Sequence, residues 1–539
     1  MATDKSPQRV LDQHQSPLFR LPRELRDEIY DYYTHEDGYI FEPSTQKLRL
    51  PTGNPIELAL SYTCKRVTKE MNGMALRKNS VEFRTLLSLP KITGQPSNAS
   101  WYEQLILSHQ VRLRHMLKWA HTIVSVEVML TVKSLYPNSF AAQRILEKAQ
   151  EGNDSQLRGG YLFNVWSLDN YNSDNCILVD LIKLMATHPD FYHLISKEYD
   201  LELRKATRSE DDYDSENDSD SDEDSDDDSD DDSDEDSDED SDDDSDSDDS
   251  LLGAFRIKRP PSYSRETQTD ILQWRPQLWS IPNRAELEAI SEFLPPWPTT
   301  IDDPVPDHEY VPDMYFSAAA VGVRFLEGLA PKAREQLRRI VIQEDHPSVA
   351  SSITHAQGLI SFCQANPKVR IERRVDIWPT EFVYRSNYFE HHTHEIVIMI
   401  GTWTNEVKIL YQMGMPADCF TLVLHGPSEA ASQQLSDAIT RAAIWLEGTV
   451  ELARREQRRF YPFQGITEDF ADVIKEMLRG EIPARFDAEM DEVWDIEKIL
   501  SEHVGEWPSK VSDVFRLRDF EEPEGGWHAA REAYKEREV

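Results

Sequence analysis

Hydrophobic residues near the N-terminus recur at helical spacing after a polar arm. Pro22 stands where a helix would begin, because its backbone angle is pre-set for the first helical turn. Apolar residues follow at steps of three and four. We therefore expect a helix whose inner face carries Leu21, Leu25, Ile29 and Tyr32 or Tyr33. In one interpretation this face packs on the next helix and binds nothing.

A hairpin and a second helix are predicted next. Two short apolar runs, 39–42 and 47–50, flank a Pro-Ser-Thr turn, which indicates two paired strands. Asn54-Pro-Ile-Glu then supplies a cap, a first-turn proline and an acidic residue close to a capping box. The helix predicted from it carries, on one face, Leu60, Cys64, Val67, Met71 and Met74. Residues 80–83 indicate a strand.

Helical and strand-like segments alternate through the rest of the chain. Before residue 200 we expect helices at 101–120 and 176–186 and strands at 122–130 and 161–166. Later segments predict helices at 316–329, 331–337 and 355–365 and strands at 339–342, 368–375, 395–400 and 419–424. The apolar run 395–400 suits a strand buried on both faces. The pattern predicts a mixed α/β fold, with α+β as the alternative.

Helices are expected to dominate the C-terminal part. Ser428 caps a long predicted helix whose inward positions are Leu435, Ile439, Ala442, Leu446, Val450 and Ala453. Shorter helices are predicted near 468–478, 487–502 and 526–537. The fold is therefore expected to end in a helical C-terminus.

An acidic run interrupts the alternation between Glu210 and Ser250. It holds 28 of the Asp and Glu residues and no Lys or Arg, so the rest of the chain carries −13 of the formal net charge of −41. Such a segment has almost nothing apolar to bury, and we expect a disordered insert between two folded lobes. The predicted organisation is a disordered arm (1–15), a small helical module (16–90), the α/β remainder of the first lobe (91–205), the insert with its basic flanks (206–265), a second α/β lobe (266–460) and C-terminal helices (461–539).

Serines recur at every fourth position within the acidic run, each with an acidic residue three positions on. The pattern resembles the substrates of acidophilic kinases of the casein-kinase class, and it predicts phosphorylation at Ser221, Ser225, Ser229, Ser233, Ser237, Ser241 and Ser245. Three roles fit the run: a solubilising spacer, a polyanion for histones or ribosomal proteins, or an internal lid over a basic patch.

Overall charge and cysteine usage exclude some classes of protein. A mildly acidic folded part does not suit a nucleic-acid binder, so no direct nucleic-acid contact is expected. The four cysteines are far apart, which favours the reducing cytoplasm or nucleus. Arg256-Ile-Lys-Arg is a short match to a nuclear-import patch. No signal peptide opens the chain and no apolar run is long enough for a bilayer, so we expect a soluble protein without membrane contact.

Catalytic patterns are weak. His391, His392, His394 and Glu395 include zinc-ligand types, but their spacing is wrong for a metalloprotease. Leu424-His-Gly-Pro-Ser could offer backbone amides to an anion, although a simple helix cap fits better. His109, His115 and His121 recur at intervals of six, which does not line one helix face. We expect no enzyme activity, no cofactor and no metal.

A resemblance rests on the first 83 residues. Leu21-Pro-x-Glu-Leu-Arg-x-x-Ile-Tyr30, Thr63-Cys-Lys-x-Val-x-x-Glu70 and Asn79-x-Val-x-Phe83 resemble the F-box-like N-terminal domain of many uncharacterised filamentous-fungal proteins. A segment between Ala319 and Trp378 is similar to one that recurs in that group. The resemblance implies a module that docks on the adaptor of a cullin-type ubiquitin ligase, with Leu21, Pro22, Leu25 and Ile29 as the partner-binding residues.

The expected function is therefore non-catalytic protein–protein interaction. Its sharper version is an F-box-like substrate receptor of a cullin-type ubiquitin ligase. The alternative is an acidic-tract protein that binds basic partners, with a purely structural F-box-like module.

Overall fold

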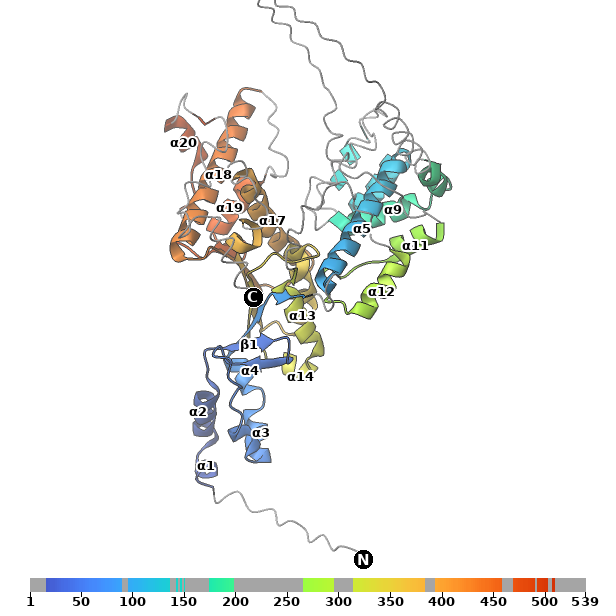
Figure 1. Ribbon diagram of the computed structural model, residues 1–539. Helices are drawn as coiled ribbons and strands as arrows, with labels where there is room; N and C mark the ends of the chain where they lie inside the picture. The colour runs from blue at the N-terminus through green and yellow to red at the C-terminus, as the bar shows by residue number, and fades with distance from the viewer. Residues whose placement is uncertain are drawn as a thin grey trace, which may run out of the picture.

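The computed structural model describes residues 16–89, 96–135, 142–143, 146–147, 150, 174–197, 265–294, 314–382, 393–457, 469–489, 492–502 and 507–508. Within them the fold is mixed α/β, as predicted, with helices packed on a mainly parallel sheet (Figure 1). The sheet has the strand order β2-β1-β3-β6-β7-β8-β9. Its strands are β1 (Tyr39–Glu42), β2 (Lys47–Arg49), β3 (Ser80–Arg84), β6 (Arg339–Glu344), β7 (Arg370–Asp376), β8 (Phe420–His425) and β9 (Ala484–Phe486).

Parallel pairing runs through most of this sheet. Only the hairpin of β1 and β2 is antiparallel, and every strand from β3 onward is parallel to its neighbours. A separate two-stranded sheet joins β4 (Leu86–Leu87) to β5 (Tyr315–Phe316). Because the parallel strands follow one another in chain order, right-handed connections place their helices on one face of the sheet.

One large core lies between that face and its helices. Alternate strand residues enter it, including the row Val81, Ile340, Ile371 and Phe420, which pair across four strands. The helices and helical turns that contribute to this core are α13 (Ala318–Gly328), a turn at Ser352–Leu359, α15 (Ile360–Ala365), α17 (Thr393–Gln412), α18 (Glu429–Arg455) and α19 (Phe470–Leu478). The short helix α14 (Pro331–Arg334) follows α13, and α20 (Ile496–Glu502) packs against α18.

A buried ion pair lies within this core. Glu344 of β6 accepts hydrogen bonds from Nε and Nη2 of Arg373 at 3.0 and 2.6 Å. The other donors to Glu344 are the amides of Ala318 and Ala319 at the start of α13. Arg373 also donates to the carbonyls of Ser352 and Ile353 and lies 4.7 Å from the centre of the Trp403 ring. The pair therefore ties two strands to α13, α17 and the turn at 352–359.

A second core is mainly helical, although Phe316 of β5 and the loop residues Val349 and Ala350 also belong to it. It contains α5 (Asn98–Trp119), α6 (Val126–Leu135), α9 (Asp174–Met185), α11 (Arg265–Gln273) and α12 (Arg284–Phe293). His109 of α5 hydrogen-bonds the carbonyl of Ile271, and Arg275 pairs with Asp180 of α9. Both cores draw on residues from both sides of the acidic run, because β3 pairs with β6 and α9 packs with α11.

Several sequence predictions are confirmed. The hairpin, the strands at 80–83, 339–342, 368–375 and 419–424, and the helices at 101–120, 176–186 and 316–329 lie where the pattern placed them, within a few residues. Ser428 caps α18 by accepting a hydrogen bond from the amide of Ala431. The helix predicted at 355–365 is divided into the turn at 352–359 and α15, the one predicted at 331–337 is limited to α14, and the one predicted at 487–502 to α20. The predictions at 161–166 and 526–537 lie outside the described residues, as does the predicted insert at 206–265 except for Arg265, which begins α11.

Two predicted strands are helices. Residues 122–130 belong to a short turn and α6, and 395–400 belong to α17. Residues 395–400 contain a continuous apolar run, in which a strand and a buried helix cannot be told apart by periodicity. Residues 122–130 are instead rich in β-branched residues, which local propensity favours in strands but which tertiary packing can place in a helix. The buried residues of α17 settle the matter over a longer window, because they recur at steps of three and four: Val397, Ile400, Trp403, Val407 and Leu410.

The helix predicted from Asn54 is also wrong. Pro55 instead forms a β-bridge with Arg49, which extends the hairpin. Helical structure begins with a 3-10 turn at Leu60–Tyr62 and continues as α3 (Lys65–Met71) and α4 (Met74–Lys78). Gly73 separates α3 from α4 with a φ of +72°, a conformation that favours glycine.

Candidate functional site

The N-terminal module consists of α1 (Pro17–Arg20), α2 (Arg23–Thr34), the 3-10 turn, α3 and α4. It projects from the sheet beside β1 (Figure 1). Its small core holds Tyr30, Val67, Met71 and Met74, with Leu60 and Cys64 packed against them. The predicted apolar face of residues 60–74 is therefore confirmed, although it is carried by three short elements.

Helix α2 turns a different face inward from the one predicted. Arg26, Tyr30 and Thr34 are buried, whereas Leu25 and Ile29 are 45% and 41% exposed. The predicted packing of Leu25 and Ile29 on the next helix is therefore wrong. The reason is Glu70 of α3, which supplies a partner for Arg26 and Tyr30 from 40 or more residues away.

An outward apolar stripe remains on α2. Leu25, Ile29 and Tyr32 follow one another at steps of four and three, which places them on one face of the helix. Tyr32 is 88% exposed. At the start of the helix Pro22 is exposed and Leu21 is half-buried. We call Leu25, Ile29 and Tyr32 the α2 stripe.

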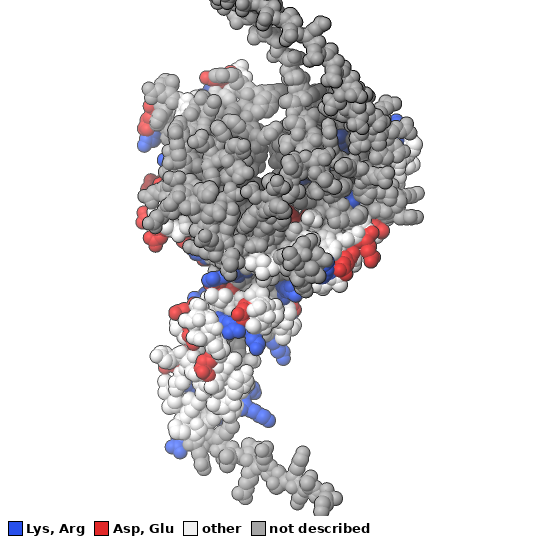
Figure 2. Space-filling model, in the orientation of Figure 1, with Lys and Arg blue, Asp and Glu red and all other residues white. Residues whose placement is uncertain are grey.

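Other exposed hydrophobic residues lie in the same module. Of the large hydrophobic side chains that are exposed in the described part of the chain, half lie between residues 25 and 62: Leu25, Ile29, Tyr32, Leu58 and Tyr62. The segment with Leu58 is attached to α2, since the Tyr33 hydroxyl donates to Glu57 and accepts from the amide of Leu60. On the face drawn in Figure 2 the module is largely uncharged. Exposed apolar residues grouped in this way mark interaction sites.

Charged groups on the inner side hold α2 in place. Glu70 accepts from Arg26 Nη2 at 2.8 Å, from Arg26 Nε at 3.0 Å, from the Tyr30 hydroxyl at 3.0 Å and from Arg66 at 3.0 Å. The hydrogen bonds from Arg26, followed by those from Arg66 and Tyr30, lower the pKa of Glu70 to about 2. The stripe is therefore presented on a helix whose rotation is fixed by directional bonds.

Lowering the pH should weaken the attachment of α2 to Glu70 of α3. The pKa of Glu70 is lower in the folded protein than in an unfolded chain, so its ionised form stabilises the fold above about pH 4.5. That contribution is lost as the pH falls toward 2. We expect the protection of α2 amides from hydrogen exchange, corrected for intrinsic rates, to fall by about tenfold over this range.

The variant Glu70→Gln should show the reduced protection at neutral pH and lose most of the acid dependence. Glu28→Gln is the matched control, because Glu28 is exposed on α2. An unchanged pH profile in Glu70→Gln would show that Glu70 does not hold the helix.

The remaining sequence candidates fall in various places. The serines from Ser221 to Ser245 lie outside the described residues, as do His391 and His392. His394 and Glu395 lie in the first turn of α17, not in a strand. His109 is buried against Trp274 in the helical core, and burial lowers its pKa to about 4. In the segment Leu424-His-Gly-Pro-Ser, which the sequence offered as an anion site, the amide of Gly426 donates a hydrogen bond to the Ser432 hydroxyl.

Comparisons with protein families, with curated proteins and with solved structures found no match. In the described part of the chain, no helix is long and apolar enough to cross a membrane. Within the same residues, no three His, Cys, Asp or Glu side chains gather so as to hold a metal ion.

Proposed function

We propose that the protein is a non-catalytic interaction protein whose N-terminal module docks a partner through the α2 stripe. One observation carries the proposal: large apolar side chains face outward on a helix whose polar face is held inward by Glu70. Residues at i, i+4 and i+7 are the pattern by which a helix fills an apolar groove of a partner. Burial of such an exposed apolar stripe by a partner is favourable, because it removes apolar surface from water.

The partner proposed is the adaptor of a cullin-type ubiquitin ligase. The motif resemblance to F-box-like domains supports this choice, because its matched residues include Leu25 and Ile29, which lie in the stripe. The sheet and the helical core would then carry the surface that recruits a substrate. A location in the cytoplasm or nucleus follows from the same proposal, since such ligases act there.

Affinity capture from the protein's own cells tests this function. We expect the tagged full chain to recover cullin and its adaptor at moderate salt, as identified by mass spectrometry. Ile29→Asp should abolish that recovery, since a carboxylate in an apolar interface is left unpaired. The matched control is Leu107→Asp on α5, where Leu107 is 43% exposed, close to the 41% of Ile29.

A second candidate function is favoured by the 28 acidic residues between 210 and 250. In that function the run binds basic proteins, and the module is purely structural. Capture of histones or ribosomal proteins alone, lost when residues 210–250 are deleted but kept in Ile29→Asp, would replace the first proposal with this one.

A further inference from the structure

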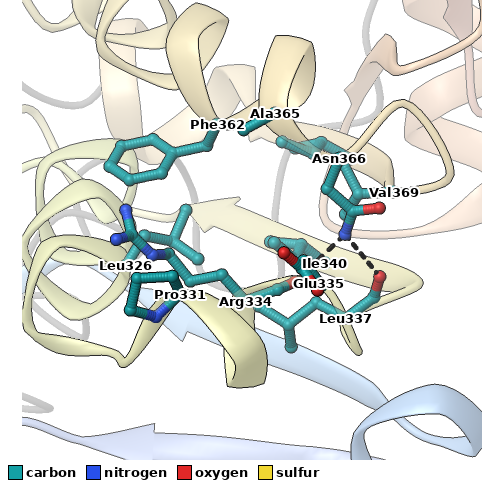
Figure 3. Close-up of a pocket in the computed structure, with 11 residues that line it drawn as sticks. Leu326, Pro331, Arg334, Glu335, Leu337, Ile340, Phe362, Ala365, Asn366 and Val369 are labelled. Atoms are coloured by element: carbon teal, nitrogen blue, oxygen red, sulfur yellow. Dashed lines mark hydrogen bonds between the residues drawn. The ribbon is translucent and has the colours of Figure 1, made fainter.

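A small cavity lies at the end of the sheet at which the central strands β6 and β7 begin. Its volume is about 150 Å³, and its apolar walls are Leu326, Leu337, Ile340, Phe362, Val369 and Ile371. Figure 3 shows Phe362, Ala365 and Asn366 on one side of the cavity, and Pro331, Arg334 and Leu337 on the other. We call this cavity the edge pocket.

The pocket is held open by hydrogen bonds within the chain. Asn366 Nδ2 donates to the carbonyls of Arg334 and Leu337 at 3.0 Å, which joins the end of α15 to the chain that follows α14. The Arg334 guanidinium lies 5.5 Å from the centre of the Phe362 ring. Both walls of the opening are therefore fixed in position without a ligand.

Basic residues line the pocket or adjoin residues that line it. Arg334 lines the pocket, and Arg338 and Arg370 donate to carbonyls of the lining residues Leu337 and Val369. Lys332 and Lys368 are exposed beside the lining residues Pro331 and Val369. None of these five side chains has a carboxylate within ion-pair distance among the residues that the structure describes.

We propose that the edge pocket binds an acidic peptide segment of a partner protein through one large apolar side chain. A cavity of this volume fits a single aliphatic or aromatic group and is smaller than a typical small-molecule site. Carboxylates on either side of the anchor would pair with these five cations. This site is separate from the α2 stripe, and its test leaves that stripe unchanged.

A peptide fits the site better than a nucleic acid. The apolar walls offer nothing to a phosphate backbone, and Glu335 places a carboxylate among the lining residues. The formal net charge of −41 would also oppose a long polyanion, whereas a short peptide at physiological salt is screened from distant charges.

Fluorescence anisotropy with the full chain tests the inference. The probe is a labelled peptide of aspartates and serines with one central leucine, and the control peptide has serine in place of that leucine. We expect the leucine peptide to bind at least about tenfold more tightly at 0.15 M salt, which corresponds to burying one large apolar side chain. Equal affinity for the two peptides would overturn the proposal, because the binding would then be electrostatic only.

Variants separate the two parts of the site. The double variant Arg334→Glu with Arg338→Glu should weaken the leucine peptide at least about tenfold, whereas Lys498→Glu, an exposed reversal on α20, should not. Ala365→Phe should fill the pocket from its exposed position and remove the preference for leucine over serine. Unchanged binding in both pocket variants would place the peptide elsewhere and contradict the inference.

Two further results would also overturn it. A single-stranded oligonucleotide of equal charge that binds more tightly than the leucine peptide would make this a nucleic-acid site. A peptide that binds only the chain lacking residues 210–250 would identify the protein's own acidic run as the occupant, in place of a partner.

Discussion

Glu344→Gln is expected to lower the free energy of unfolding of the sheet core by about 3–5 kcal/mol, the usual cost of leaving one member of a buried ion pair without its partner. The Glu344 and Arg373 side chains are only 3% and 1% exposed, so water cannot replace the lost carboxylate. The amides of Ala318 and Ala319 would also lose their charged acceptor.

Thermal unfolding measures this effect. For a domain of 150–250 residues we expect the melting temperature of the sheet core to fall by roughly 6–20 °C. Tryptophan fluorescence is a suitable signal, because Trp403 lies against Arg373. The matched control is Glu327→Gln on the exposed side of α13, which should change the melting temperature little.

Replacing both partners separates the ion pair from the shape of the core. Glu344→Gln combined with Arg373→Met should cost less than the sum of the two single changes, because no unpaired charge remains. Additive losses in this double variant would show that the two side chains do not act as a pair.

Leu25→Asp combined with Ile29→Asp should weaken binding of the purified adaptor at least about 100-fold. Each change places an unpaired carboxylate in an apolar interface, and a cost of about 1.4 kcal/mol for each already gives a factor of ten. Leu25 and Ile29 lie on the surface of the free protein, outside its core, so the free energy of unfolding should change by less than about 0.5 kcal/mol. Isothermal titration calorimetry gives the affinity, and Leu107→Asp is the control.

A loss of affinity of less than tenfold in this double variant would argue against the α2 stripe as the docking surface. A loss of the native circular dichroism spectrum would leave binding uninterpretable for that protein, so Tyr32→Ser provides a milder second test. Tyr32 is 88% exposed, and we expect its removal to weaken binding by about tenfold or more without affecting the fold.

The strands of the sheet were predictable because their local pattern is strong. Alternate residues of β6 and β7 are buried, and this period of two is visible in Ile340-Val-Ile and in Val369-Arg-Ile-Glu. The amphipathic period of α18 is equally clear from Leu435 to Leu446. In these elements, burial follows directly from the position of each apolar residue.

Non-local pairing explains most of what could not be predicted. The face that α2 buries depends on Glu70, which attracts Arg26 and Tyr30 although Leu25 and Ile29 are the more apolar residues. The pairing of β3 with β6 joins residues that are more than 250 positions apart. Apolar runs such as 395–400 carry no period of their own, so only their neighbours decide between strand and helix.

The sequence predicts only part of the candidate site. The motif names Leu25 and Ile29 as partner-binding residues, together with Leu21 and Pro22, whereas the periodicity predicts that Leu25 and Ile29 are buried. The periodicity also places Tyr32 or Tyr33 on the inner face; Tyr33 packs against the module core, and Tyr32 belongs to the stripe. The sequence does not predict that Leu58 and Tyr62 are exposed, and it does not predict the edge pocket. Exposed hydrophobic residues and cavities result from the packing of segments that are distant in the sequence.

Hydroxyl-radical footprinting of the full chain, with and without the purified adaptor, can show whether the adaptor covers the α2 stripe. The method reports the solvent access of individual side chains, and Leu25, Ile29 and Tyr32 are all accessible in the free protein. We expect adaptor binding to reduce the labelling of these three residues several-fold and to leave the labelling of Leu107 unchanged. Adaptor binding that leaves the three residues fully labelled, or no adaptor binding at all, would contradict this expectation.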